Sequence, residues 1–494
     1  MLKMRYLYGV LLQILFLLHY VYCEDFNLFG EAGQAYALVV YIGHPPQKLH
    51  VLVDTGSTTL AIAAYARKDS NIYYHEGNST TLYNSGKEVQ AKYSQGTWSG
   101  QLASDFIQFP SLPSIPEVRS DLALITKSYK FFMNGSGWQG LLGLAYLPVA
   151  AWGENVVVGS WLDFLEKSVK KPMSFELKLC GTQSPVNATH YGKLTMFDDN
   201  NATEIRDFVY RTPILRKRWY EVGVLSIRLL NTTKSNNLTE SLKGNKTSDF
   251  NLNTINIDNC RELNIEKSIV DSGTTSIRMP DAIFRQVVNE LRNSAQVSNM
   301  LILDEFWYHG EAACWPEPQD WYLPSLAIDI LSTEADNQYF TLEIPAQNFM
   351  RVITARNNTA ATGTVSEFCY KLGLEAGGKE TVLGYTAMEG LQVLFNRSAG
   401  WIGWKESSCG PNARVTGPFN TTKSLLYMCQ LTEQLPDVNV SIKAAQWTLC
   451  AISIVAAAVL IYLLAPCIKM FFIRPLPRSQ QISLSQAALV EQET

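Results

Sequence analysis

The chain has 494 residues, of which 47% are hydrophobic and 17% charged, a composition typical of a folded globular protein rather than a disordered one. A chain of this length can bury about two or three domain-sized cores. The formal net charge of −4 provides no basic field for a nucleic-acid backbone, so we expect no DNA or RNA partner.

The chain begins with the pattern of an export signal. Lys3 and Arg5 precede a mostly apolar stretch at residues 6–20, and the small residue Cys23 suits a cleavage site. We therefore expect a signal peptide at residues 1–23, followed by a short amino-terminal segment at residues 24–34. The alternative is an uncleaved anchor, which is disfavoured because the apolar stretch is shorter than a bilayer normally requires.

Residues 35–395 carry mostly the sequence signals of β-strands. Short runs of β-branched and aromatic residues, bounded by turn residues, predict a mainly β body. The predicted strands lie within residues 35–60, 89–109, 122–132, 175–179, 194–197, 220–230, 268–277, 341–344 and 391–395. Helical periodicity is confined to residues 159–169 and 280–294, and the early proline of the second segment suits a helix start.

The carboxyl-terminal part predicts a membrane span. After a stalk at residues 431–443, residues 444–468 carry no charge and are long enough as a helix to cross a bilayer. Lys469, Arg474 and Arg478 follow, which predicts that the tail at residues 469–494 is cytoplasmic. We expect a single-pass type I membrane protein of the secretory pathway, in the Golgi, endosomes or cell surface, with a lumenal or extracellular body. A buried core helix is the weaker alternative, because core helices seldom remain uncharged for so long.

The cysteines and glycosylation signals agree with export. Six cysteines lie in the body, an even number that predicts three disulfides whose pairing the spacing leaves open. They are Cys180, Cys260, Cys314, Cys369, Cys409 and Cys429. Asn-x-Ser/Thr sequences predict N-linked glycans on exposed loops. They begin at Asn78, Asn134, Asn187, Asn201, Asn231, Asn237, Asn245, Asn357, Asn396, Asn420 and Asn439.

One motif occurs twice in the body. Val-Asp-Thr-Gly-Ser at residues 53–57 and Val-Asp-Ser-Gly-Thr at residues 270–274 place Asp54 and Asp271 217 residues apart. This self-similarity predicts two β lobes, at residues 35–212 and 213–430, each with one copy. The second lobe would contain a polar insertion loop at residues 231–253, where several glycosylation signals gather.

The paired motif predicts acid–base chemistry. Two adjacent carboxyls cannot both ionise, so they share a proton, and one can act as a base while the other acts as an acid. The glycines allow sharp turns beside each carboxyl, and the hydroxyls can hold the carboxyls in place. These supporting residues are Thr55, Gly56, Ser57, Ser272, Gly273 and Thr274. A single Asp-Thr-Gly could be an ordinary turn after a strand, but two matching copies are hard to explain that way.

The sequence motifs of other hydrolytic mechanisms are missing. The sequence has no His-Glu-x-x-His, no Gly-x-Ser-x-Gly and no P-loop, which argues against a metalloprotease, a serine hydrolase or a nucleotide-driven enzyme. Asp198 and Asp199 lack the ligand spacing of a calcium loop, and the cysteines lack the spacing of a zinc site. We expect no metal and no cofactor.

At the paired motif the chain resembles the pepsin family of aspartic proteases, and more closely its membrane-bound β-secretase (memapsin) branch, over residues 33–429. Residues 93–100 look like the flap hairpin that closes over a substrate, although any glycine-tipped hairpin could give this pattern. Residues 134–145 and 382–390 resemble the two apolar segments that thread behind the catalytic loops. Arg278 matches a basic subsite residue of β-secretases; its alternative is a surface arginine.

The resemblance implies a bilobal pepsin-like fold with the active site in a cleft between the lobes. It implies Asp54 and Asp271 as the catalytic pair. The substrate-binding residues would be Tyr93, Gln95, Gly96, Trp98, Thr275 and Arg278. It also pairs the cysteines as Cys180 with Cys409, Cys260 with Cys429, and Cys314 with Cys369.

The function that follows is an aspartic endopeptidase, anchored by one helix, that cleaves polypeptides, above all membrane or lumenal proteins. Two alternatives remain. One is a broad degradative protease like cathepsin D, because sequence does not reveal subsite preference. The other is a catalytically silent binding module, which is disfavoured because both carboxyls are present.

Overall fold

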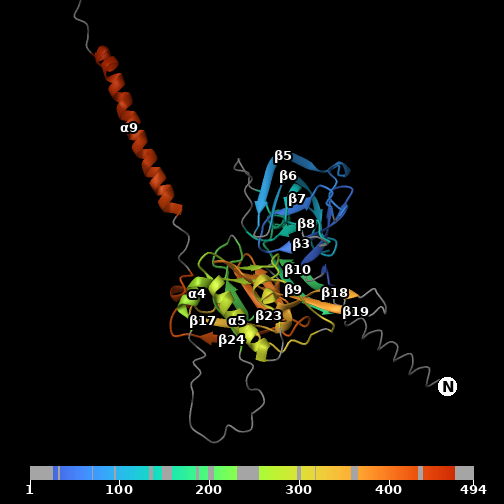
Figure 1. Cartoon of the computed structure of the whole chain (residues 1–494). Helices are drawn as coiled ribbons and strands as arrows, with labels where there is room; N and C mark the ends of the chain where they lie inside the picture. The colour runs from blue at the N-terminus through green and yellow to red at the C-terminus, as the bar shows by residue number, and fades with distance from the viewer. Residues whose placement is uncertain are drawn as a thin grey trace, which may run out of the picture. The chain divides into compact units, whose positions relative to one another are not determined.

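The computed structural model describes residues 26–472 except 32–33, 69, 94–95, 133–136, 147–157, 185–187, 199–204, 218, 231–254, 298–301, 318, 358–364 and 432–437 (Figure 1). The predicted signal peptide, the whole predicted insertion loop and nearly all of the predicted cytoplasmic tail lie outside the described residues. The chain divides into two compact units, Met1–Thr432 and Glu433–Thr494.

The first unit is mainly β, as the sequence predicts. Among the described residues its largest sheet has 13 strands and includes strands from both predicted lobes. In spatial order they are β11 (Tyr210–Pro213), β23 (Trp401–Glu406), β22 (Leu391–Asn396), β9 (Met173–Ser184), β10 (Thr189–Asp198), β1 (Leu28–Glu31), β2 (Gln34–Ile42), β3 (Gln47–Asp54), β8 (Gly140–Gly143), β4 (Leu60–Ala63), β7 (Val118–Tyr129), β6 (Thr97–Gln108) and β5 (Tyr83–Lys92).

Three smaller sheets are formed by residues of the predicted second lobe, again counting only what the structure describes. One contains β12 (Val224–Leu229), β16 (Leu326–Leu331), β17 (Gln338–Ile344) and β24 (Arg414–Asn420). Another contains β13 (Ser268–Asp271), β21 (Thr381–Gly384), β14 (Ile277–Met279) and β20 (Leu374–Ala376). The third contains β15 (Ala313–Trp315), β19 (Val365–Leu372) and β18 (Met350–Asn357).

Both predicted helices form, with small shifts at their ends. α2 (Trp161–Val169) begins after Ser160, whose hydroxyl accepts a hydrogen bond from the Asp163 amide at 3.1 Å and caps the helix. α5 (Asp281–Val297) begins just after the proline that marked its start. The other helices that the structure describes in the first unit are short, and the sequence did not predict them. They are η1 (Glu76–Asn78), α4 (Ile257–Leu263), α6 (Asp304–His309), α7 (Ala346–Phe349), η2 (Tyr385–Ala387) and α8 (Leu425–Met428).

The end of β3 shows why an aspartate is carried into the interior. The strand pairs with β2 on one side and, over its last four residues, with β8 in parallel on the other. Its last four residues are all buried, whereas its first half alternates. A strand end covered on both faces must be apolar, which accounts for the Val-Leu-Val before Asp54.

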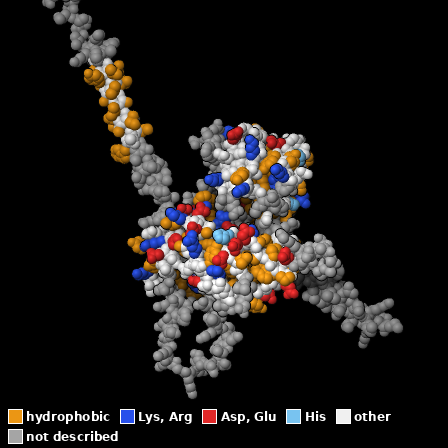
Figure 2. Space-filling model, viewed as in Figure 1, with side chains coloured by type: hydrophobic (Ala, Val, Ile, Leu, Met, Phe, Trp, Pro, Cys, Tyr) orange, Lys and Arg blue, Asp and Glu red, His pale blue; other side chains and the backbone are white. Residues whose placement is uncertain are grey.

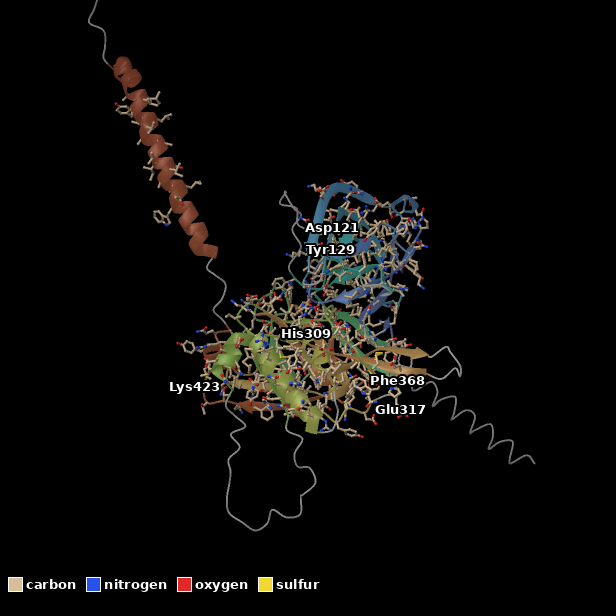
Figure 3. The ribbon with its side chains drawn as sticks, viewed as in Figure 1. Asp121, Tyr129, His309, Glu317, Phe368 and Lys423 are labelled. Atoms are coloured by element: carbon tan, nitrogen blue, oxygen red, sulfur yellow. A yellow bond between two sulfur atoms is a disulfide. The ribbon has the colours of Figure 1, made fainter. Side chains whose placement is uncertain are left out.

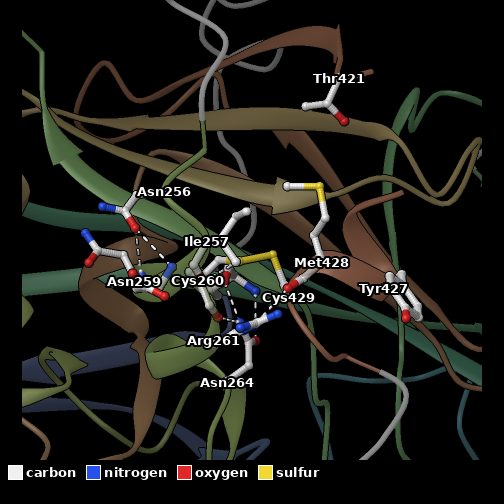
Figure 4. The surroundings of a disulfide bond; sticks show 12 residues. Asn256, Ile257, Asn259, Cys260, Arg261, Asn264, Thr421, Tyr427, Met428 and Cys429 are labelled. Atoms are coloured by element: carbon white, nitrogen blue, oxygen red, sulfur yellow. Dashed lines mark hydrogen bonds between the residues drawn. A yellow bond between two sulfur atoms is a disulfide. The ribbon is translucent and has the colours of Figure 1, made fainter. Parts of the chain in front are cut away.

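Three disulfides join the six cysteines of the body in the pairs that the resemblance implies: Cys180–Cys409, Cys260–Cys429 and Cys314–Cys369. The second links α4 to the residue after α8 (Figure 4). Asn256 caps α4 there, accepting hydrogen bonds from two backbone amides at 3.0 and 3.2 Å. Phe368, beside Cys369 on β19, lies near the third disulfide (Figure 3).

The second unit contains one long helix, α9 (Val438–Phe472). Its segment Trp447–Ala465 has a mean hydropathy of 2.5 over 19 residues, and none of that segment is buried. Hydrophobic side chains cover the described part of this helix in Figure 2. Length and composition therefore make it a candidate membrane span, in agreement with the sequence.

Candidate active site

Asp54 and Asp271 each stand at the end of a strand that meets a parallel partner. Asp54 ends β3 and is paired with Gly143 of β8, while Asp271 ends β13 and is paired with Gly384 of β21. Both side chains are buried, with 5% and 9% of their surface exposed. The repeated sequence motif therefore folds into a repeated local structure.

The same hydrogen bonds hold the two carboxyls. Each accepts a hydrogen bond at 2.8 Å from the amide of the glycine two residues later, Gly56 or Gly273. Each also accepts one from the hydroxyl three residues later, which is Ser57 for Asp54 and Thr274, at 2.7 Å, for Asp271. With two donors on each carboxyl, the orientation of both carboxyl planes is fixed.

A reciprocal set of hydrogen bonds joins the two loops. The Thr55 amide donates to the Ser272 hydroxyl at 3.1 Å, and the Ser272 amide donates to the Thr55 hydroxyl at 2.9 Å. Each hydroxyl in turn donates to a backbone carbonyl of the opposite strand, at Val270 or Val53. All of these groups are buried, so this network fixes one loop against the other.

The two carboxyls are close neighbours. A Cβ placed on Gly56 would lie 2.6 Å from the Asp271 carboxyl carbon, and one on Gly273 would lie 2.7 Å from that of Asp54. Burial, followed by the charge of Asp271, raises the pKa of Asp54 well above its ordinary value. The arrangement can therefore hold one proton between two carboxyls, as general acid–base chemistry requires.

The predicted hairpin is formed by β5 and β6, and its turn is closed by a hydrogen bond from the Tyr93 amide to the Gly96 carbonyl at 2.8 Å. The buried Trp98 directs its indole N–H at the Tyr93 hydroxyl, 3.4 Å away. Burial and the nearby Asp54 carboxylate raise the pKa of the Tyr93 hydroxyl. The structure thus brings Tyr93 close to the carboxyl pair, while Gln95 lies outside the described residues.

An aromatic cluster that the sequence did not predict packs against this tyrosine. The ring of Phe131 lies 5.4 Å from that of Tyr93, and Trp138 lies 5.7 Å from Phe131 and 5.1 Å from Phe132. Arg67 covers the Phe132 ring at 4.3 Å and donates to the Trp138 carbonyl at 3.2 Å. The sequence signal for this cluster is the pair of consecutive phenylalanines, Phe131 and Phe132, at the end of the predicted strand 122–132. In the structure they follow β7, which ends at Tyr129.

The remaining predicted binding residues follow Asp271. Thr275 is partly exposed, and its hydroxyl lies at hydrogen-bond distance, 2.8 Å, from the Tyr385 hydroxyl. Arg278, on β14, is 12% exposed and forms an ion pair with Glu375 at 3.1 Å. The resemblance did not indicate this acidic partner. Glu375 lies on the adjacent strand β20 and balances the charge of the arginine.

One group of potential metal ligands lies elsewhere in the described part of the chain. Cys314, Glu367 and Cys369 have ligand atoms within 4.8 Å of one another. The two sulfurs are joined in a disulfide and are not thiolates, so this group is unsuited to a metal ion.

Comparison with known proteins agrees with this geometry. A family model described as eukaryotic aspartyl protease matches residues 35–471. A beta-secretase of Strongylocentrotus purpuratus is 30% identical over 410 residues, covering 79% of this chain and 70% of that protein. Pepsin A-5 of Mus musculus is 29% identical over 135 residues, which cover 26% of this chain and 34% of that protein. Chymosin of Ovis aries is 26% identical over 156 residues, covering 29% and 40% of the two chains. The chain therefore belongs to the eukaryotic aspartyl protease family, and it is an aspartic endopeptidase related to beta-secretase.

Proposed function

We propose that Asp54 and Asp271 are the catalytic pair of this endopeptidase. The observation that carries the proposal is their close approach within matching hydrogen-bond sets. Burial and the charge of Asp271 raise the pKa of Asp54, so the pair can hold one shared proton, with one carboxyl acting as the base and the other as the acid. Thr55 and Ser272 hold the loops together, and the glycines let the carboxyls meet.

Peptide hydrolysis would then proceed without a metal. One carboxyl takes a proton from a water held between Asp54 and Asp271, the water oxygen bonds to the scissile carbonyl carbon, and the proton of the other carboxyl passes to the carbonyl oxygen. In the second step the carbon–nitrogen bond breaks as the nitrogen takes the proton from the first carboxyl. One hydroxyl of the intermediate returns its proton to the second carboxyl, which restores the starting state.

Substrate would be held under the hairpin. We assign direct contacts to Tyr93, Gln95 and Gly96 on the hairpin and to Thr275 and Arg278 on the opposite side. Trp98 is 2% exposed, so its role is to orient the Tyr93 hydroxyl. The aromatic cluster beside Tyr93 favours an apolar substrate side chain there, because aromatic rings bury a large apolar surface.

We further propose a type I membrane protein whose lumenal or extracellular body sheds membrane or lumenal proteins in the Golgi, endosomes or cell surface. The apolar α9 and the basic residues after it support this topology. A tether raises the effective concentration of substrates in the same membrane, which favours β-secretase-like shedding over broad degradation. N-linked glycans on the body belong to the same proposal.

A cleavage assay tests the catalytic pair. The full chain, purified in detergent, is incubated with a peptide mixture near pH 4.5, alongside Asp54→Asn and Asp271→Asn, and with the exposed Asp258→Asn as control. Wild type and the control should cleave, and either site variant should lose activity by at least about 1,000-fold. The proposal would be overturned if the wild-type protein cleaved no peptide, or if Asp271→Asn cleaved as fast as wild type. Among the cleaved peptides, a narrow side-chain preference supports shedding and a broad hydrophobic one supports degradation.

A further inference from the structure

Tyr385 connects the two sides of the candidate site. It follows β21 and is fully buried, and its hydroxyl accepts a hydrogen bond from the Ala35 amide at 3.2 Å. The same hydroxyl lies 2.8 Å from the hydroxyl of Thr275. Ala35 is on β2, the neighbour of the strand that ends in Asp54, whereas Thr275 lies in the loop that follows Asp271. One phenol therefore contacts both halves.

The backbone at Ala35 is held in an unusual conformation. Its φ angle is 59°, in the left-handed region that side-chain-bearing residues seldom adopt. Both of its polar backbone groups are bound, the amide by Tyr385 and the carbonyl by Nε2 of the buried His190. Such a conformation persists only where the surroundings hold it firmly, and it is typical of functional sites.

A buried ion pair fixes the position of Tyr385. The Arg351 guanidinium lies 4.8 Å from the Tyr385 ring and binds Glu389 through two hydrogen bonds of 2.8 and 3.2 Å. Glu389 also accepts from the Tyr36 hydroxyl at 2.8 Å. The two charged side chains are 5% and 3% exposed. A buried pair with this many hydrogen bonds is rigid, so the tyrosine has little freedom to move.

Both the backbone carbonyl and the side-chain hydroxyl of Thr275 are hydrogen-bonded. Its carbonyl accepts from the Thr386 amide at 3.1 Å, and its hydroxyl meets the Tyr385 hydroxyl. The preceding residue, Thr274, donates to the Asp271 carboxylate. The hydroxyl of the partly exposed Thr275 is therefore held at a fixed place relative to the carboxyl pair.

We propose that Tyr385 is a positioning residue for substrate binding, acting by orienting the Thr275 hydroxyl toward the bound peptide. The inference rests on the proposed function, because it requires Asp54 and Asp271 to cleave a peptide that Thr275 contacts. It adds a residue to the site that the repeated motif does not contain. The chemistry recognised is a polar backbone group of an extended peptide.

Steady-state kinetics of the full chain on one cleaved peptide test this role. Tyr385→Phe keeps the ring and removes the hydroxyl, so KM should rise about 3- to 10-fold, the range of one neutral hydrogen bond, with kcat within about 2-fold. Thr275→Val should give the same rise, and the double variant should show no further loss. Thr275→Ser retains a hydroxyl and should keep the wild-type KM. Tyr74→Phe, which removes another buried hydroxyl, one bonded to Asp105 at 2.7 Å, should leave KM unchanged.

The outcomes separate this inference from the catalytic assignment. Active wild type with unchanged KM in Tyr385→Phe, or losses that add in the double variant, would overturn the positioning role and leave the catalytic pair intact. If Tyr385→Phe fails to fold by thermal melting, the threonine variants decide, since equal KM for Thr275→Val and Thr275→Ser contradicts the role. Wild type without cleavage would remove both proposals.

Discussion

At the scale of single residues, the site depends on two glycines that leave room for the opposite carboxyl. Gly56 faces Asp271 and Gly273 faces Asp54, and a Cβ at these positions would lie 2.6 and 2.7 Å from the partner's carboxyl carbon, well inside van der Waals contact. The need for glycine here comes from close approach, because neither residue has a positive φ. The pair can therefore meet only while both positions lack a side chain.

Gly56→Ala tests this requirement. The added methyl would displace the Asp271 carboxyl, and misplacement by about 1 Å costs on the order of 100-fold in rate, so kcat/KM should fall by at least that factor. Gly77→Ala is the matched control, because a Cβ there meets nothing within 4 Å. Peptide cleavage and thermal melting are measured together. Full activity of a folded Gly56→Ala protein would contradict the close approach of the two loops.

Asp54→Asn gives a prediction about stability and pH. Because the pKa of Asp54 is raised in the folded protein, the native state favours the protonated carboxyl and loses stability as pH rises from the ordinary value of 3.8 through the raised pKa. A neutral asparagine avoids this loss. Asp54→Asn should therefore melt at the wild-type temperature near pH 3 and at a higher temperature than wild type near pH 7. A variant that is less stable at neutral pH would contradict the raised pKa.

At the level of secondary-structure elements, the turn between β22 and β23 buries one of the predicted glycosylation sites. Asn396, the last residue of β22, is 4% exposed, and its side-chain oxygen accepts hydrogen bonds from the Ala399 amide and the Ser398 hydroxyl. Arg397 is also buried and pairs with Asp163 of α2 at 3.2 Å. A sugar at Asn396 would have no room in this packed turn.

Glycan mapping tests this point. Asn78 and Asn420 are exposed, so glycopeptide mass spectrometry of the exported protein should find sugars on these two residues and none on Asn396. Asn78→Gln and Asn420→Gln should each increase electrophoretic mobility, whereas Asn396→Gln should not. A glycan on Asn396 of the folded protein would contradict its buried position.

At the scale of the whole molecule, the chain combines a catalytic body with an apolar helix. The two compact units of the chain separate near residue 432, and the candidate span lies wholly in the second. The body contains the complete carboxyl pair and its three disulfides. Catalysis and membrane attachment should therefore be separable by truncation.

A chain ending at residue 432 should be secreted and should keep kcat/KM on a soluble peptide within about 2-fold of the full chain, because the site is contained in the first unit. Cleavage of a membrane protein in the same cells should fall by at least about 10-fold, because the tether no longer concentrates enzyme and substrate. Carbonate extraction of membranes checks the attachment. Equal cleavage of the membrane substrate by both forms would contradict the proposed benefit of anchoring.

The amino-acid sequence alone predicts the mainly β composition, the candidate span and the two aspartate motifs. These features follow from local patterns. The alternation of apolar and polar residues, the length of an apolar run and a repeated five-residue motif can be recognised without knowledge of tertiary contacts. The short helices α4 and α6 were missed, because seven or six residues are too few to show a helical period. The pairing of the cysteines came only through the resemblance, since spacing alone permits many arrangements.

The assembly of the site depends on contacts between distant parts of the chain, which the sequence does not reveal. The Thr55–Ser272 hydrogen bonds join residues 217 positions apart, and the Ala35–Tyr385 contact joins residues 350 apart. The Phe131 ring beside Tyr93 and the Glu375 beside Arg278 also depend on how strands are placed side by side. Side-chain periodicity along one strand cannot reveal its neighbours, because pairing is set by packing of the whole body. The sequence thus supplied the two carboxyls, and the fold supplied the groups that hold them together.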